Sequence, residues 1–393
     1  MKILKAYKFK LKTNESQSAM LRCFAGHCRF VWNKVLGEQK ERLAQNLSCE
    51  RYNTFAKKLP IWKKVEDLSR LSEAPSSALQ QKLKDLDKAL KDDCDKKQPN
   101  KKFPKFKKRG DGDSFRIPQA SQFKVSGNRI FLPKIGWLRF FKSQEIEGQL
   151  KQVTVSQSTG HWYIAIQVEY EVSIHHNLTS GAIGIDMGVS KLFAASDGTI
   201  VEPVNSFKKY QDKLAKSQRK LSKKTKFSGG WKRQKRHIQK IHSKIANIRK
   251  DYLHKATTQF SKNHAMIVIE DLQVKNMSAT AKGKNIKAKT GLNRSILDQG
   301  WFEARLQLTY KQKWHNGLLV VVPAHYTSQR CSKCGHTCKA NRLSQSQFVC
   351  KKCHHTENAD INAAKNILAA GHVVLAGGES ALADFVKPEP LVA

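Results

Sequence analysis

The sequence is short of acidic residues, of cysteine and of long apolar runs, and each shortage excludes a class of protein. Only 32 of its 393 residues are Asp or Glu, against 72 Lys and Arg, which gives a formal net charge of +40. A compact protein with this charge repels itself, so the composition predicts a large polyanionic partner; small acidic ligands do not account for it. Nine cysteines are too few for a disulfide scaffold and indicate a reducing compartment.

Apolar segments are equally limited. The longest purely apolar run is Leu318–Val322, far below the roughly 20 residues that a membrane-spanning helix requires. The basic first twelve residues are not followed by the apolar segment of a secretory signal. We therefore expect an intracellular protein with no membrane partner. At roughly 100 to 200 residues per domain, its length predicts two or three domains.

The N-terminal half changes its hydrophobic period twice. Residues 2–12 alternate apolar and basic side chains, which predicts one strand of a half-exposed sheet. Residues 16–91 have helical spacing and predict three or four helices. Residues 115–172 return to a period of two, which predicts a small antiparallel sheet or barrel. We expect the opening strand to complete this sheet, so that the helical region is an insertion in it.

The C-terminal half predicts alternating strands and helices. In chain order we expect strands at 183–185 and 191–196, two long basic helices between 206 and 255 separated near 228–230, a strand at 266–270, a mobile loop at 276–290, a helix at 295–314, a strand at 318–322 and a final helix at 359–370. The last residues lose the basic bias, and we expect a disordered tail there.

The segment between the insertion and the sheet is strongly basic. Residues 96–109 read KKQPNKKFPKFKKR, with eight Lys or Arg, no acid and two phenylalanines. A solvated, flexible loop is one interpretation. The interleaved aromatic rings favour a contact with a nucleic-acid backbone, because cations pair with phosphates while rings pack or stack. The candidate contact residues are Lys102, Phe103, Lys105, Lys107, Lys108 and Arg109.

Four cysteines form two closely spaced pairs, Cys331-x2-Cys334 and Cys350-x2-Cys353. Zinc takes four such ligands at tetrahedral corners, and each CxxC knuckle presents two thiolates to one ion. The spacing predicts a zinc ribbon holding one structural Zn²⁺ with no open position for water. The remaining cysteines are dispersed, apart from Cys338, which lies between the pairs and is not needed as a ligand.

Three carboxylates stand out by position. Asp186 ends a predicted strand, Glu270 ends another, and Asp360 begins the last predicted helix. If these elements build an RNase H-like fold, the three meet at one edge of its sheet, where clustered carboxylates require cations between them. Two Mg²⁺ ions there would serve phosphodiester hydrolysis. Taken singly, the residues could instead be a turn residue, a helix start and an N-cap.

The motifs in order resemble the TnpB family, transposon-encoded relatives of the type V CRISPR effector nucleases. In the C-terminal half they are GIDMGVSKLFAASDG, IEDL followed by KNM, YTSQRCSKCG and CKKCHHTENADINAAKNI. In the N-terminal half they are FAGHCRFVWNKVL, FPKFKKR and LPKIGWLRF. The resemblance therefore covers nearly the whole chain.

The resemblance implies a multidomain α+β architecture in which two domains are each interrupted by another. Its parts are a WED-type β-barrel at 1–13 and 112–178, a helical REC domain at 14–111, an RNase H-like RuvC nuclease domain at 179–324 and 355–375, a zinc ribbon at 325–354, and the tail at 376–393.

The resemblance also implies a function: RNA-guided cleavage of DNA next to a short transposon-adjacent motif. Asp186, Glu270 and Asp360 match all three catalytic acids of the family. Tyr52 and Gln80 match contacts to the motif by position, and Ser76 stands where a longer basic residue can occur. The implied partners are a transposon-end guide RNA and double-stranded target DNA, which forms an RNA–DNA heteroduplex on a monomeric protein in the prokaryotic cytoplasm or nucleoid.

Two other functions remain open from the residues. A catalytically silent, RNA-guided repressor would keep the acids for structure. A strand-transfer transposase would use the same three carboxylates, but a zinc ribbon placed just before the third one favours the guided nucleases.

Overall fold

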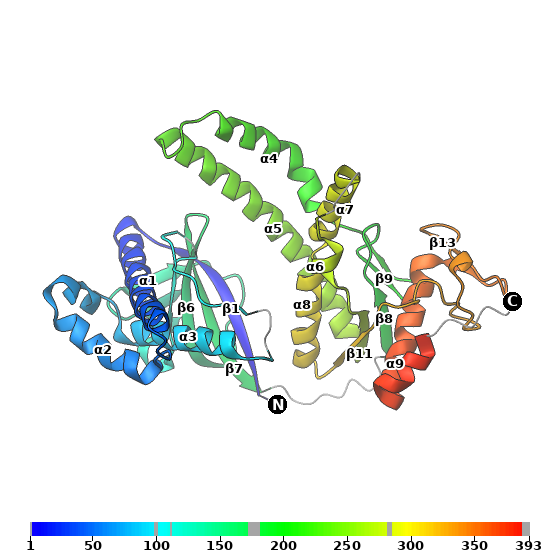
Figure 1. Ribbon diagram of the computed structural model, residues 1–393, viewed down its shortest axis with the longest axis horizontal. Coiled ribbons are helices and arrows are strands. Elements are labelled where there is room, and N and C mark those ends of the chain that lie inside the picture. The colour runs from blue at the N-terminus through cyan, green and yellow to red at the C-terminus, as the bar shows by residue number, and fades with distance from the viewer. Residues whose placement is uncertain (1, 98–100, 111, 172–180, 281–284, 387–393) are drawn as a thin grey trace. The chain divides into compact units, whose positions relative to one another are not determined.

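The computed structural model describes residues 2–97, 101–110, 112–171, 181–280 and 285–386 (Figure 1). The chain forms two compact units, Met1–Val172 and Ser173–Ala393. None of the helices in the described ranges is long and apolar enough to cross a membrane.

The first unit is built on a seven-stranded antiparallel sheet with the order β2-β6-β7-β1-β5-β4-β3. Its strands are β1 (Lys2–Lys12), β2 (Ser114–Ile117), β3 (Lys124–Ser126), β4 (Arg129–Leu132), β5 (Gly136–Phe140), β6 (Gln149–Ser158) and β7 (His161–Glu171). Strand β1 buries Tyr7, Phe9 and Leu11 on one face, as its alternation predicted. It pairs with β7 on one side and β5 on the other, so the opening strand completes the sheet.

The expected barrel is an open sheet among the described strands. Strands β2 and β3 end the order, with one neighbour each. Both are short, with four and three residues, so they offer few hydrogen bonds for closing a barrel.

The helical region between β1 and β2 packs on this sheet. It contains α1 (Glu15–Ala44), α2 (Tyr52–Lys64), the 3₁₀ helix η1 (Glu66–Glu73) and α3 (Ser76–Cys94). Helix α1 begins with a capping box, in which Asn14 and Gln17 each satisfy the other's backbone N–H. The helices and the sheet share one hydrophobic core, where Phe24 of α1 meets Phe115 of β2 edge to face at 5.7 Å.

The second unit contains a five-stranded sheet with the order β10-β9-β8-β11-β12. Its strands are β8 (Ala182–Asp186), β9 (Phe193–Ala195), β10 (Ile200–Val201), β11 (Met266–Glu270) and β12 (Leu318–Val322). Strands β8, β11 and β12 are parallel, whereas β9 and β10 are antiparallel additions at one edge. The predicted strands of this half are therefore confirmed.

The described helices of this unit are α4 (Ser206–Ser222), α5 (Gly229–Asn263), α6 (Val274–Met277), α7 (Ile286–Gln299), α8 (Trp301–Trp314) and α9 (Ala359–Val386). Helices α5 and α8 cover one face of the sheet and α9 covers the other. On β11, Ile267 and Ile269 face the core formed with α5 and α8, while Met266 and Val268 face α9. Burial on both faces explains why β11 reads as a continuous apolar run.

Helices α4 and α5 form the long basic hairpin that the sequence predicted (Figure 1). Leu214, Ile238, Ile241 and Ile245 form the buried stripe between them. The break lies at residues 223–228, and Ser228 caps α5 by accepting a hydrogen bond from Trp231 N.

Three expectations about this half were wrong. Residues 286–290 belong to α7 and not to a loop, since Lys289 Nζ anchors the start of the helix to Met277 O at 2.6 Å. The single helix expected at 295–314 is two helices, because Gly300 turns the chain with a φ of 72°.

The third wrong expectation concerns the last residues of the chain. Helix α9 continues past residue 370 through Val386, because Val373 and Val374 still pack against the sheet core. A tail beginning at residue 376 is thus wrong for residues 376–386. The rest of the expected tail lies outside the described residues.

Candidate functional site

The three predicted acids meet at one edge of the second sheet. Asp186 and Glu270 are the last residues of the parallel strands β8 and β11, so both lie at the same edge. Alternation along the strands places both on the face covered by α9: Ala182 and Val268 pack there, and a Cβ on Gly184 would collide with the α9 backbone. Asp360 lies in the first turn of α9.

The electrostatics of Asp186 agree with this placement. Burial, followed by the negative charges of Glu270 and Asp360, raises the pKa of Asp186 from its ordinary value of 3.8 to about 7. Burial also raises the pKa of Glu270, whose side chain is only 7% exposed. The site therefore disfavours the charged forms of Asp186 and Glu270.

Two neighbours of these acids were missed by the sequence analysis. Thr327 Oγ1 donates to Glu270 Oε1 at 2.6 Å, and Arg342 Nη2 donates to Asp360 Oδ1 at 3.1 Å. Arg342 also opposes the rise in the pKa of Asp186. Both residues belong to the segment predicted as zinc ribbon, and no spacing rule connects them to acids on other elements.

Asp360 is not the N-cap of its helix. Asn358 Oδ1 accepts from Asp360 N at 3.0 Å and from Ile361 N at 3.3 Å, so Asn358 takes the capping role. The carboxylate of Asp360 therefore remains available to the site.

The acids suit Mg²⁺. Magnesium prefers hard oxygen ligands and binds through a few carboxylates plus substrate phosphates. Burial, and then the negative charges of Glu270 and Asp360, raise the pKa of Asp186, and Arg342 offsets this rise only in part. A divalent cation would remove this repulsion, so the donor set fits the expected ions.

The four cysteines of the predicted ribbon converge. Their sulfurs all lie within 4.8 Å of one another, with 3.7 Å between Cys331 and Cys353 and 3.6 Å between Cys334 and Cys350. With Zn–S bonds of about 2.3 Å, the edge of a tetrahedral site is roughly 3.8 Å. The cluster thus fits one zinc ion, and Cys338 lies outside it.

Buried amides dock this cluster onto α9. Asn362 Oδ1 accepts from Ser332 N at 2.9 Å, and Asn362 Nδ2 donates to Arg330 O at 2.9 Å. One turn later, Asn366 Nδ2 donates to Arg330 O and to Thr327 O. The β13 (Gln347–Val349) and β14 (Thr356–Asn358) hairpin then leads directly into the helix. The cysteine cluster is therefore structurally coupled to Thr327, Arg342 and Asp360.

The basic segment before β2 is anchored to α1. Asn33 forms two hydrogen bonds with the backbone of Lys107, and Trp32 Nε1 donates to Lys105 O at 3.1 Å. The ammonium of Lys107 lies 3.8 Å from the centre of the Trp32 ring, and burial lowers the pKa of this lysine to about 8. Phe103 packs against the core. These anchors leave the remaining predicted contact residues exposed: Lys102, Lys105, Lys108 and Arg109.

The predicted DNA-motif residues lie in the helical insertion. Tyr52 begins α2 and lines a cavity of about 250 Å³ with cations that include Arg51 and Lys84. Ser76 begins α3 and accepts from Lys63 Nζ at 2.6 Å, and Gln80 is exposed one turn further along. The cavity contains Tyr52 but neither Ser76 nor Gln80.

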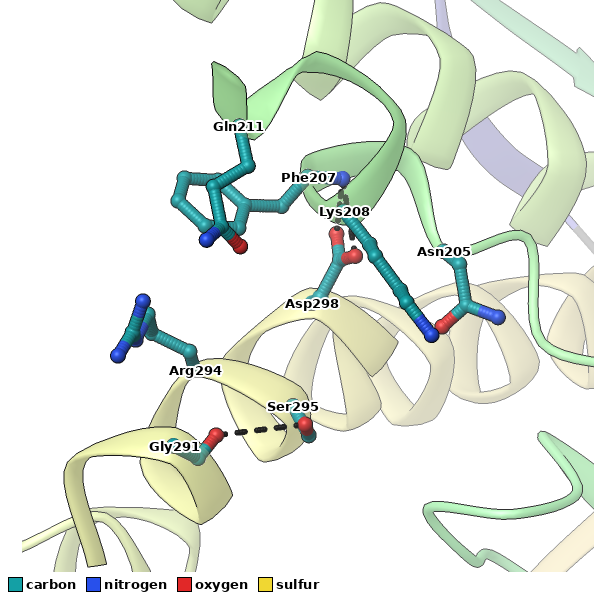
Figure 2. A pocket seen from close by; sticks show the side chains of 8 residues that line it. All are labelled: Asn205, Phe207, Lys208, Gln211, Gly291, Arg294, Ser295 and Asp298. Carbon is teal, nitrogen blue, oxygen red and sulfur yellow. Dashed lines mark hydrogen bonds between the residues drawn. The ribbon is translucent and has the colours of Figure 1, made fainter. Parts of the chain in front are cut away.

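Two cationic cavities lie along the α4–α5 hairpin. One, of about 300 Å³, lies where α4 meets α7, with Lys208 and Arg294 among its lining residues (Figure 2). Its Asp298 carboxylate accepts from Phe207 N at 2.9 Å and Ser206 Oγ at 2.8 Å, which fixes the start of α4. The other, of about 340 Å³, is lined by Lys213, Lys216, Ser217, Lys220 and His237. The sequence predicted the basic helices but not these cavities.

Comparison with known proteins places this arrangement in a family. The chain is 54% identical over 385 residues to a putative RNA-guided DNA endonuclease, InsQ, of Escherichia coli K12, covering 96% of this chain and 95% of InsQ. The OrfB_IS605 family, described as probable transposase, matches residues 165–281. The chain belongs to the TnpB (OrfB_IS605) family.

This TnpB-family chain is also similar to another relative and to two further family models. A putative RNA-guided DNA endonuclease of Streptomyces pristinaespiralis is 30% identical over 392 residues, covering 98% of this chain and 93% of the relative. The Cas12f1-like TNB domain matches residues 301–367, which include the cysteine cluster and Asp360. A helix-turn-helix family matches residues 1–48, which here form β1 and α1.

The TnpB-family fold is also seen in a solved structure. The cryo-EM structure of a Cas12f1–sgRNA–target DNA complex aligns with a TM-score of 0.55 at 14% identity, covering 93% of this chain and 98% of Cas12f1. At this identity the match concerns the fold alone.

Proposed function

We propose that this chain is an RNA-guided, Mg²⁺-dependent DNA endonuclease of a transposon. The observation that carries the proposal is the convergence of Asp186, Glu270 and Asp360 from two strand ends and one helix start. The names of the InsQ and Streptomyces relatives support the guided reaction.

The chemistry follows from what the residues hold. Two Mg²⁺ ions on the three carboxylates would activate the attacking water and stabilise the leaving 3′ oxygen. Thr327 orients Glu270 by its short hydrogen bond, and Arg342 holds Asp360 by another. Because both residues come from the ribbon segment, the structural Zn²⁺ supports the site without taking part in hydrolysis.

The charge of the chain supports the RNA partner. A heteroduplex of roughly 20 base pairs carries about 40 phosphates, before the rest of the guide RNA is counted. The protein's +40 is of that scale. We assign the contacts to the nucleic-acid backbone to the basic hairpin and to the exposed cations of residues 102–109. A protein whose target is read by base pairing with a guide RNA needs mainly such backbone contacts.

The finer organisation is part of the proposal. We assign the first unit to WED and REC parts and the second to RuvC with its zinc ribbon, in a monomeric ribonucleoprotein of the prokaryotic cytoplasm or nucleoid. Tyr52, Ser76 and Gln80 are proposed to read the transposon-adjacent motif. Tyr52 lines a cationic cavity, and Gln80 is exposed and can pair with an adenine edge.

The test is to sequence the RNA that copurifies with the protein and to reprogram it. We expect a transposon-end transcript, and Mg²⁺-dependent cleavage that follows the guide when its variable segment is changed. The control is the same complex with a guide that matches no site on the substrate. Occupancy of the matched site without scission at any Mg²⁺ concentration would show a silent repressor, and joined transposon–target products would show a transposase.

A further inference from the structure

A second cluster of metal-binding side chains lies in the helical insertion, away from the ribbon cysteines in the sequence. It consists of Cys23 and His27 of α1 and Glu73, the last residue of η1. One ligand atom from each lies within 4.8 Å of the others. Cys23 and His27 are four residues apart, which places both on one face of the helix.

The spacing matches a zinc coordination sphere. Cys23 Sγ is 3.1 Å from Glu73 Oε2 and 3.8 Å from the His27 ring nitrogens. Bonds of about 2.3 Å to sulfur and about 2.0 Å to nitrogen or oxygen give tetrahedral edges of roughly 3.5 Å. The two observed separations lie on either side of that value. Because Cys23 Sγ is equally far from both ring nitrogens, the His27 ring must turn to direct one of them at the ion.

The charges balance as well. In the metal-free protein, the Cys23 thiol donates to the Glu73 carboxylate. When Zn²⁺ binds, a Zn–S bond forms and the thiol proton leaves to solvent, so one thiolate and one carboxylate neutralise the ion. This matters because the Arg70 guanidinium lies nearby, over the Phe30 ring at 5.5 Å. A neutral site adds no repulsion to that cation.

We propose that Cys23, His27 and Glu73 bind a second Zn²⁺, distinct from the ion of the four-cysteine cluster. Thiolate and imidazole favour zinc over Mg²⁺. Three protein ligands leave the fourth position to water, on the side where Glu73 is exposed. The ion ties the end of η1 to α1 across fifty residues of sequence. The proposal does not rest on the proposed nuclease function.

The test is the zinc content of the full-length protein, purified with its RNA and measured by elemental analysis after dialysis against micromolar zinc. We expect two zinc ions per chain in the wild type, and one fewer in Cys23→Ser and in His27→Ala. Cys94→Ser removes an exposed cysteine of the same unit and is the matched control, with no loss expected.

A second measurement keeps the test independent of the folding of variants. Limited chelation of the wild type should remove one zinc before the other, because a site with one thiolate and an open position is weaker than one with four thiolates. Equal zinc content in the wild type and a folded Cys23→Ser variant would overturn the proposal. A wild type that holds no zinc beyond the four-cysteine ion would overturn it too.

Discussion

At the scale of single residues, the site is defined by a partly buried carboxyl beside two other acids, whose charges the protein offsets only in part. Asp186 is partly buried at a strand end, next to the charges of Glu270 and Asp360, and its pKa is raised to about 7. Arg342 compensates only in part. Strongly perturbed carboxyls cluster at functional sites, so the raised pKa of Asp186 favours a site that receives cations.

The raised pKa of Asp186 predicts how Asp186→Asn changes the stability of the protein in the absence of metal ions. The folded-state pKa lies above the ordinary 3.8, so protonated Asp186 favours the folded state, and this contribution is lost as the pH rises from about 4 to about 7. The amide carries no charge, so the variant should be more stable than wild type at pH 8, by at most roughly 4 kcal/mol, and by less at pH 5. Chemical denaturation at the two pH values measures the difference.

The same variant separates charge repulsion from metal binding. Mg²⁺ should raise the melting temperature of the wild type at pH 8 and should raise that of Asp186→Asn much less. Asp212→Ala, which removes an exposed acid of α4, is the control and should respond to Mg²⁺ as the wild type does. An equal Mg²⁺ response in Asp186→Asn would argue against a cation site at these acids.

At the scale of elements, the site depends on the close packing of α9 against β8 and on the ribbon that docks on α9. Gly184 lets the helix backbone approach the strand: a Cβ there would collide with Ala364 O and lie 2.7 Å from Leu368 N. The ribbon is held to the same helix by Asn362 and Asn366. Asp186 and Asp360 thus keep their positions through two packing contacts.

Gly184→Ala should disrupt the first contact. Strand and helix must separate to admit the methyl group, so we expect a loss of about 3 kcal/mol in the free energy of unfolding and a large loss of cleavage. Gly181→Ala, three residues earlier, meets nothing within 4 Å and should be close to wild type. Denaturant titration and cleavage rates test the pair, and equal stability of the two variants would contradict the packing.

Loss of zinc from the ribbon should disrupt the second contact. Structural zinc supplies folding free energy on the order of 10 kcal/mol to small domains, so Cys350→Ser should leave the ribbon unfolded. Thr327 and Arg342 then lose their fixed positions beside Glu270 and Asp360, and cleavage should fall at least tenfold. The control is Cys338→Ser, outside the cluster. Full cleavage by zinc-depleted Cys350→Ser protein would show that the ribbon does not support the site.

At the scale of the whole molecule, the dominant feature is positive charge without compensation. The net charge of +40 is spread over both units, with one concentration in residues 96–109 and another in the α4–α5 hairpin. The cavity between α4 and α5 gathers Lys213, Lys216 and Lys220. Polyanion binding should therefore be strong, salt-dependent and distributed over many sites.

Salt titration tests this distribution. Affinity for a 20-nucleotide single-stranded RNA should fall at least about 300-fold between 50 and 200 mM salt, as expected for six or more phosphate contacts. Replacing Lys213, Lys216 and Lys220 with Gln should reduce the slope of log affinity against log salt by up to roughly 2. The triple replacement of Glu41, Glu66 and Asp67, which are exposed acids, with Gln is the control and should not reduce it. An affinity that falls less than tenfold would contradict the account.

Features that depend on the local sequence pattern could be predicted, and features that depend on contacts between distant segments could not. Strand periodicity located β8 and β11 and therefore Asp186 and Glu270 at one sheet edge, because parallel strands end together. Thr327 and Arg342 were missed because their positions depend on how the ribbon folds around its cysteines. The start of α7 was missed for a related reason, since its residues show no apolar periodicity and a contact from Lys289 to Met277 holds them.

The central claim is that a guide RNA directs cleavage by Asp186, Glu270 and Asp360. The most direct measurement compares binding and cleavage of guide-matched DNA in Mg²⁺ by the wild-type ribonucleoprotein, Asp186→Ala and the control Asp212→Ala. We predict that all three bind the DNA equally, that wild type and Asp212→Ala cut it, and that Asp186→Ala does not. Cleavage by Asp186→Ala at the wild-type rate would contradict the account.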